Sequence, residues 1–419
     1  MSPEVYSRRS LDDELDELLP LASAIALEGP KGVGKTRTAL RRSDAAWFLD
    51  DESHRALVSA DPTFAAAPPG TLLIDEWQRL PSVWDSVRRR VDEGAPAGRF
   101  LLSGSATPVD GTVVHSGAGR ILSLRMRPMA LYERPGASPS IRLRHLLDGR
   151  QGPIGGTTST SLVDYFEAIE STGLPGLMRE PPRLRRPLLR SYVDQILLKD
   201  LPEQGLAVRR PETLRRWLAA YAAASSTTAA YSRILDSATA GDGSHPAKTT
   251  TIAYRDHLTQ LFLLDPVPGW SPSRSPLRRL QQAPKHQLAD PGLAAAILGL
   301  TAQRLLSPHG AHVAGPLFEA LATLSVRVAA QSAEARVGHL RTGNGDREVD
   351  LIVEGESGQV LGIEVKMSAS VGDADVRHLR WLREQLGSDV VDLVVLTTGT
   401  HAYRRPDGIA VIPLALLGA

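Results

Sequence analysis

Short apolar runs alternate with stretches of helical periodicity over the N-terminal part of the chain. The run at 23–28 stops at a glycine, which is typical of a buried strand. Residues 81–92 predict a helix, because their apolar members recur on one face at helical spacing. Further helices are expected at 11–19 and 35–42, and further strands at 45–49, 71–74 and 99–102. Alternation of this kind predicts a parallel sheet covered by helices, and therefore an α/β fold.

The pattern changes along the rest of the chain. Residues 134–160 are rich in Gly, Ser, Thr and Pro, which favours a connection between domains. Helical periodicity dominates 161–265, and a stretch rich in Pro, Ser and Arg follows at 266–285. Mixed structure then returns, with helices at 315–329 and 375–386, a hairpin of 349–353 and 360–365, and a strand at 391–396. We therefore expect three domains, at 1–150, 151–285 and 286–419.

Composition narrows the class of protein. The chain has 419 residues and a net charge of +1, so any surface that attracts nucleic acid must be local. It has no cysteine, which excludes disulfides, thiol nucleophiles and zinc–thiolate sites. The acidic N-terminus lacks the apolar core of a signal peptide, and no run reaches the roughly 18 apolar residues that span a membrane. We therefore expect a cytoplasmic protein with no membrane partner.

The sequence GPKGVGKT meets the complete P-loop pattern, between a predicted strand and a predicted helix. Glycines let the backbone turn its N–H groups toward phosphate oxygens, and the helix N-terminus adds partial positive charge. We expect Lys35 to reach the β- and γ-phosphates and the Thr36 hydroxyl to bind Mg²⁺. The predicted cofactors are therefore ATP and Mg²⁺. The predicted nucleotide-binding residues are Gly29, Pro30, Lys31, Gly32, Val33, Gly34, Lys35 and Thr36.

Two later strands supply polar partners for this site. LLIDE carries Asp75 and Glu76 to the carboxyl edge of the predicted sheet, where ligands collect. We expect Asp75 to hold Mg²⁺, directly or through water, and Glu76 to act as general base on the attacking water. RFLLSGS ends in Ser103 and Ser105, either of which could contact the γ-phosphate or the water. The alternatives are a surface Asp-Glu pair and an ordinary strand-to-turn transition.

Arg120 lies in GAGRIL, in a loop before a further strand. An arginine there could stabilise the charge of phosphoryl transfer, in its own subunit or in a neighbour of a homo-oligomer. The alternative is a solvated surface arginine.

A second group of charged residues lies in the predicted C-terminal hairpin. Glu364 and Lys366 are two apart on one strand and so share a face, and the hairpin brings Asp350 beside them. Two carboxylates can bind a divalent metal, and a lysine can orient or activate water, which together suit phosphodiester hydrolysis. Glu319, on the preceding helix, could add a carboxylate. The alternative is a solvated hairpin face with cross-strand ion pairs.

The middle segment has the order of a winged helix-turn-helix. Helices are expected at 231–238 and 248–258, joined by a Gly-Asp-Gly-Ser loop and followed by a strand-like run at 261–264. Such a module could bind DNA or could serve only in packing and protein interaction. The residues that could face phosphates or bases are Lys248, Arg255 and His257 on the second helix.

The chain resembles prokaryotic AAA-type ATP-binding proteins that join a P-loop domain to a C-terminal domain of unknown function. The stretches that carry this resemblance include LEGPKGVGKT, LLIDEWQRLPSVWDSVRRRVD, KHQLADPGLAAAILG, and REVDLIV with GIEVK. The resemblance implies a winged-helix middle and a C-terminal restriction-endonuclease-like (PD-(D/E)XK) core, whose acidic-acidic-lysine signature Asp350, Glu364 and Lys366 would match. This chain has Lys31-Gly32 where most such proteins have Arg-Gln.

The leading hypothesis is an ATPase whose nucleotide state controls a DNA-binding or nuclease-like C-terminal module. The second hypothesis is a nucleotide-dependent switch or binding protein in which the nuclease fold is inactive. The third is a protein that holds ATP without useful turnover.

Overall fold

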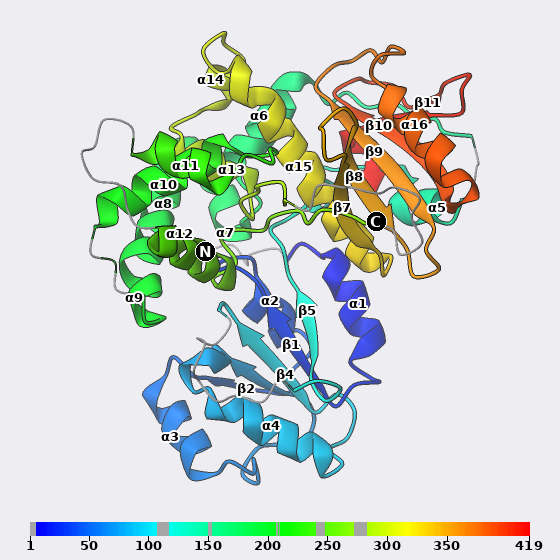
Figure 1. Ribbon diagram of the computed structural model, residues 1–419. Coiled ribbons are helices and arrows are strands. Elements are labelled where there is room, and N and C mark those ends of the chain that lie inside the picture. The colour runs from blue at the N-terminus through cyan, green and yellow to red at the C-terminus, as the bar shows by residue number, and fades with distance from the viewer. Residues whose placement is uncertain are drawn as a thin grey trace.

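The computed structural model describes residues 6–106, 117–149, 153–206, 208, 210–239, 248–271 and 283–419. A sheet at the N-terminal end, a group of helices in the middle and a second sheet at the C-terminal end follow one another (Figure 1). The long helix α15 (Ala311–Ser332) contacts both the middle helices and the second sheet. The observed class is α/β, as the sequence predicts.

The N-terminal sheet has five parallel strands in the order β2–β3–β4–β1–β5. The strands and helices predicted there are present within two residues of the expected bounds. The helix α3 was not predicted, because only Val58 of it is buried and the apolar stripe is correspondingly weak. The strands are β1 (Ala24–Glu28), β2 (Ala45–Phe48), β3 (Leu72–Asp75), β4 (Phe100–Gly104) and β5 (Leu122–Arg125), and the helical segments are α1 (Ser10–Leu18), α2 (Lys35–Leu40), α3 (Glu52–Ala60), η1 (Trp77–Arg79) and α4 (Ser82–Asp92).

The middle of the chain is helical, as its periodicity predicts. The run at 261–264 is a buried turn rather than a strand, and only Leu264 pairs, with Leu288. Val267 pairs in the same way with Lys285, and the expected loop at 241–244 lies outside the described residues. The helical segments are α6 (Leu162–Ser171), α7 (Pro175–Met178), α8 (Pro182–Gln195), η3 (Ile196–Asp200), α9 (Leu201–Glu203), α10 (Pro211–Ala223), α11 (Tyr231–Ala238), α12 (Lys248–Gln260), α13 (Pro291–Ile297) and α14 (Ala302–Leu305).

The C-terminal sheet is mixed, in the order β11–β12–β10–β9–β8–β7. The predicted hairpin is β8 and β9, which are antiparallel, and β10 runs parallel to β9. The strands are β7 (Arg336–Arg341), β8 (Glu348–Glu354), β9 (Val360–Lys366), β10 (Val390–Thr397), β11 (Tyr403–Arg404) and β12 (Ala410–Pro413), with α16 (Arg377–Leu386), η4 (Gly387–Asp389) and η5 (Leu414–Leu416) around them.

The expected boundary at residue 150 does not match the packing. Strand β6 (Ile141–Arg142) pairs with β13 (Leu417–Gly418), near the end of the chain. Helix α5 (Leu143–Leu147), which follows η2 (Leu131–Glu133) and β6, contacts β9 and β10 (Figure 1). Its three leucines are buried there, and composition alone does not reveal that partner. The segment after the first sheet therefore packs as part of the C-terminal unit.

Among the described residues, α15 is the one helix long and apolar enough to cross a membrane. Its apolar residues are interrupted by Glu319 and Arg327, so it is no unbroken apolar run of the length that the sequence analysis considered. In this fold 72% of the most apolar window of α15 is buried inside the protein. Its hydrophobicity is accounted for by its place between the middle helices and the second sheet.

Candidate nucleotide site and C-terminal acidic pocket

The P-loop connects the end of β1 to the start of α2. A Cβ on Gly29 would lie 2.1 Å from the carbonyl oxygen of Met126, so this position admits only glycine. Gly32 and Gly34 have φ of 76° and 104°, a region that glycine adopts without the steric cost of a side chain. The glycine spacing that defines the motif is therefore required by the backbone.

The side chain of Lys35 is buried at the centre of this loop. Its Nζ donates to the carbonyl oxygens of Gly29 at 2.8 Å and Pro30 at 2.9 Å. Burial lowers the pKa of Lys35 to about 8, although the charges of Glu76 and Asp75 oppose that shift. The ammonium thus lies among backbone carbonyls of the loop, and no carboxylate of the described residues is in direct contact with it.

Asp75 and Ser103 end neighbouring parallel strands and face each other in register. The Ser103 hydroxyl donates to one carboxylate oxygen of Asp75, and the Thr36 hydroxyl lies 3.0 and 3.1 Å from the two oxygens. Burial raises the pKa of Asp75. Hydroxyl and carboxylate oxygens are the ligands that Mg²⁺ prefers, and the direct partners of Asp75 are neutral, so these residues fit a Mg²⁺ ion.

Glu76 follows directly and has the uncommon left-handed φ of 54°. Its carboxylate accepts from the Ser105 hydroxyl at 3.0 Å and from the side-chain amide of Gln78. The amide of Gln78 also donates to Ser105 at 3.1 Å, which closes a small network. The sequence predicted Glu76 and Ser105 for this edge but gave no signal for Gln78.

Lys31 makes a contact that the sequence did not predict. Its ammonium donates to the carboxylate of Asp200, at the end of η3, at 2.6 Å. The Tyr192 hydroxyl, on α8, donates to the backbone carbonyl of Lys31 at 3.1 Å. The middle helices therefore hold the P-loop directly through one of its side chains and its backbone.

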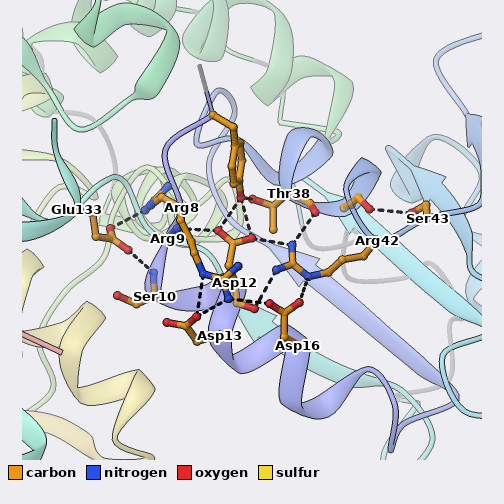
Figure 2. Close-up of polar contacts among 12 residues, drawn as sticks. Arg8, Arg9, Ser10, Asp12, Asp13, Asp16, Thr38, Arg42, Ser43 and Glu133 are labelled. Carbon is orange, nitrogen blue, oxygen red and sulfur yellow. Dashed lines mark hydrogen bonds and ion pairs between the residues drawn. The ribbon is translucent and has the colours of Figure 1, made fainter. Parts of the chain in front are cut away.

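The N-terminal arm ties α1 to the P-loop helix α2 (Figure 2). Arg42 donates to Asp12 and Asp16, each at 2.7 Å. Arg9 is buried, pairs with Glu133 at 3.0 Å and donates to the carbonyl of Val33 at 3.2 Å. These contacts hold the P-loop backbone at Val33 and the residues that follow α2.

Arg120 does not approach the P-loop of its own chain. It precedes β5, and Leu122 of that strand aligns with Ile25 near the start of β1, whereas the P-loop follows the end of β1. Its guanidinium instead pairs with Asp92 of α4 at 2.9 Å. A role within the same subunit therefore does not fit this geometry.

At the other end of β5, two arginines meet a buried carboxylate of the middle segment. Arg127 pairs with Asp265 at 2.9 Å, Arg125 lies 3.8 Å from it, and Arg327 of α15 lies at 3.1 Å. Burial alone would raise the pKa of Asp265, but the guanidiniums hold it well below its usual value. We call these four residues the Asp265 cluster; it joins the first sheet to the middle segment and to α15.

The structure brings together the C-terminal residues that the sequence singled out. Asp350 accepts from the backbone N–H of Val365 at 2.9 Å, and Lys366 pairs with Glu364 at 2.8 Å. Burial and then the negative charge of Asp350 raise the pKa of Glu364 well above its usual value. Glu319 of α15 lies beside them, as expected, and we call this buried group of charged side chains the acidic pocket.

A second lysine, which the sequence did not predict here, lies inside this acidic pocket. Lys285 is 1% exposed, and its Nζ lies 2.9 Å from Glu319, 2.9 Å from Asp350 and 3.1 Å from Glu348. Burial alone would lower the pKa of Lys285, but these carboxylates raise it well above its usual value. Among the described residues, no group of three or more His, Cys, Asp or Glu side chains is arranged to hold a metal ion. The two oxygens of Asp350 accept from the ammonium of Lys285 and from the N–H of Val365, so the pocket with Lys285 in place does not fit the divalent metal predicted for Asp350 and Glu364.

The candidate DNA-facing residues lie on α12. Arg255 pairs with Asp256 at 2.8 Å and covers the ring of Tyr231 at 5.1 Å. His257 is half-buried, and the side chain of Lys248 lies outside what the structure describes. These contacts pack α12 against α11 and leave the predicted nucleic-acid role of the helix untested.

Residues 22–134 match the family of AAA domains. Residues 163–304 match a domain of unknown function (DUF8612), and residues 314–417 match another (DUF4143). The middle match extends through α13 and α14, past the boundary expected at 285.

The chain is 27% identical to an uncharacterized protein of Mycobacterium tuberculosis and to one of Mycobacterium bovis, over 98% of this chain and 84% of each relative. It is similar to the Walker-type ATPase of Pyrococcus abyssi, with a TM-score of 0.41 and 13% identity, over 71% of this chain and 97% of that one. The structure of Drosophila ORC bound to DNA gives a TM-score of 0.23 and 15% identity, over 61% and 86%. Both structural likenesses are too distant to bear on function. The AAA-domain match, together with the P-loop geometry, supports an AAA-type P-loop ATPase domain that binds ATP at the N-terminal end of this chain.

Proposed function

We propose that the N-terminal domain binds ATP with Mg²⁺ and hydrolyses it, and that the nucleotide state controls the C-terminal module. The observation that carries the proposal is the convergence of Lys35, Thr36, Asp75 and Glu76 at one edge of the parallel sheet. Ligands of open α/β sheets bind at this carboxyl edge.

Each residue has a distinct part in the proposed reaction. Lys35 pairs with the β- and γ-phosphates, and Thr36 and Asp75 hold Mg²⁺, which when bound neutralises charge on the phosphate oxygens. Glu76 takes the proton of the attacking water, and its carboxylate is oriented for this by Ser105 and Gln78.

Two direct contacts support a route from the nucleotide to the rest of the chain. The P-loop residue Lys31 is held by Asp200, and the strand end beside the P-loop is held by the Asp265 cluster. Movement of the loop on binding phosphate would act on both. Val267, two residues beyond Asp265, pairs with Lys285, so the second contact leads to the acidic pocket.

For the C-terminal module we propose a restriction-endonuclease-like core with DNA as its ligand. The order helix, three strands, helix, strand from α15 to β10 supports it, since it agrees with what the resemblance implies. The alternative, a switch with an inactive nuclease fold, is favoured by one observation: Lys285 lies among the carboxylates. The paired segments after α11 and α12 suit a winged helix that could bind DNA.

Arg120 is proposed to act only on the nucleotide of a neighbouring subunit, which requires a homo-oligomer. Its place before the start of β5, at the end of the β1–β5 pair opposite the P-loop, supports this choice. A cytoplasmic location suits these activities.

The ATPase proposal is tested by ATP binding and phosphate release. Lys35→Ala should lose ATP binding, because the phosphates lose their cationic partner, whereas Glu76→Gln should bind ATP and lose turnover. Lys199→Ala, at an exposed lysine of η3, is the matched control and should behave as wild type. Unchanged ATP affinity in Lys35→Ala would remove the assignment.

The control of the module is tested by hydrogen exchange. A non-hydrolysable ATP analogue should change the exchange of amides in β8 and β9 of the wild type. Asp265→Asn should weaken that change while leaving ATP affinity within about threefold, since Asp265 contacts no predicted nucleotide-binding residue. An equal response in wild type and Asp265→Asn would exclude this route.

A further inference from the structure

Lys285 has the place in the acidic pocket that a divalent cation would need. The ammonium donates to Glu319 and Asp350, each at 2.9 Å, and forms an ion pair with Glu348 at 3.1 Å. These oxygens come from two elements, α15 and β8, that are separated in the chain by β7. All three carboxylates contact the ammonium, so a metal could reach these oxygens only by displacing the lysine.

The backbone of Lys285 is held as firmly as its side chain. Its N–H donates to the carbonyl of Val267 and its carbonyl accepts from the N–H of Val267, both at 2.9 Å. Its side chain is 1% exposed, so leaving the pocket would move a buried charge and break this pairing. Among the described residues, the other charged groups facing the pocket are Glu364 with Lys366, and Arg341, which lies 3.7 Å from Glu348.

We propose that Lys285 is a built-in counter-cation that takes the place of a metal ion in the C-terminal pocket. With Lys285 in place the pocket binds no Mg²⁺ or Mn²⁺, and the module does not cleave nucleic acid by a metal-dependent route. This inference rests on the proposed switch with an inactive nuclease fold, and it gives a physical reason for the inactivity. It does not depend on ATP hydrolysis.

The geometry predicts that removing the ammonium creates a metal site. In Lys285→Met the aliphatic length is kept, and the carboxylates of Asp350, Glu319 and Glu348 lose their shared partner. Like charges held this close repel, so a divalent cation should then be taken up. Lys366→Met is the matched control, because Lys366 pairs with Glu364 and leaves Lys285 in place.

The test measures melting temperature without nucleotide, with and without Mn²⁺, in the full chain. Asp350→Asn is introduced into wild type, Lys285→Met and Lys366→Met. Each protein is compared with its Asp350→Asn counterpart, so the effect of Mn²⁺ bound at Thr36 and Asp75 on the melting temperature cancels. Wild type and Asp350→Asn should show the same Mn²⁺ shift. Lys285→Met should melt lower than wild type without metal and gain about 3 °C or more beyond Lys285→Met/Asp350→Asn with saturating Mn²⁺. Lys366→Met should show no such gain.

A larger Mn²⁺ shift in wild type than in Asp350→Asn would overturn the inference, since the pocket would then bind metal beside Lys285. Equal shifts in Lys285→Met and its Asp350→Asn double variant would also overturn it. If Lys285→Met does not fold, electron paramagnetic resonance is used instead to measure Mn²⁺ binding to wild type and to Asp350→Asn. Asp350-dependent binding counts against the inference, and its absence supports it. Failure of the ATPase proposal leaves all these comparisons unchanged.

Discussion

The two acidic sites of this chain contain similar residues, but the carboxylates have different hydrogen-bond partners. At the N-terminal site, Asp75 accepts from the hydroxyls of Thr36 and Ser103, and the nearby lysine, Lys35, donates to backbone carbonyls. At the C-terminal site, Asp350 accepts from the buried ammonium of Lys285 and from a backbone N–H. One carboxylate therefore has neutral side-chain partners, and the other has a cation.

The two lysines show the same contrast in their pKa values. Burial lowers the pKa of Lys35 to about 8 against the charges of Glu76 and Asp75, and no carboxylate of the described residues touches its ammonium. Lys285 is equally buried, but its carboxylate partners raise its pKa well above the usual value. A pair of carboxylates close in space thus indicates a metal site only when no internal cation already neutralises it.

The largest expected difference between the two sites is in ATP turnover. Asp75→Asn should lower kcat by about 100-fold or more, because Mg²⁺ loses a charged ligand during phosphoryl transfer. Asp350→Asn, the same change at the other site, should leave kcat within about twofold. Phosphate release at saturating ATP measures both kcat values. A comparable loss in the two variants would mean that both carboxylates take part in ATP hydrolysis.

The second difference concerns stability. Lys285→Met should lower the free energy of unfolding by about 3–5 kcal/mol, because it leaves buried carboxylates without their cation. Lys366→Met should cost less, since its side chain is 32% exposed and Glu364, whose pKa burial raises, can take up a proton when its partner is removed. Urea titration gives both values. Equal losses would mean that burial does not distinguish the two lysines.

The third difference is the pH dependence of ATP affinity. Only the charged form of Lys35 pairs with phosphate, and its lowered pKa of about 8 means that the charge is lost as pH rises through that value. ATP affinity should be nearly constant between pH 6.5 and 7.5 and about tenfold weaker at pH 9 than at pH 7. Calorimetric titration across this range checks it; a flat profile up to pH 9 would show that the ammonium keeps its charge.

The smallest expected effect is that of Arg120. In dilute protein, where subunits are separate, Arg120→Ala should change kcat by less than about twofold, because Arg120 pairs with Asp92 away from its own P-loop. A loss that appears only as protein concentration rises would support action on a neighbour. A large loss at every concentration would place Arg120 at its own nucleotide.

Much of the N-terminal site could be predicted from the sequence. The glycine spacing of residues 29–36, the strand before it and the carboxylates after β3 are local signals, and backbone sterics gives them a fixed meaning. The meeting of Asp350, Glu364 and Lys366 was also predictable, because strand alternation and a hairpin fix which residues share a face. The run at 261–264 was misassigned, since a short apolar run can be a buried turn as well as a strand.

The sequence by itself determined the elements, their order and the residues that face one another within a motif, because these depend on local periodicity and backbone geometry. The tertiary structure alone decided which distant charges meet. Lys31 and Asp200 are 169 residues apart, and Lys285 and Asp350 are 65 apart. Nothing near Lys285 in the sequence marks it as buried, since a lysine's burial depends on carboxylates that other elements bring to it. The packing of α15 and β8 around Lys285 therefore determines the chemistry of the C-terminal pocket.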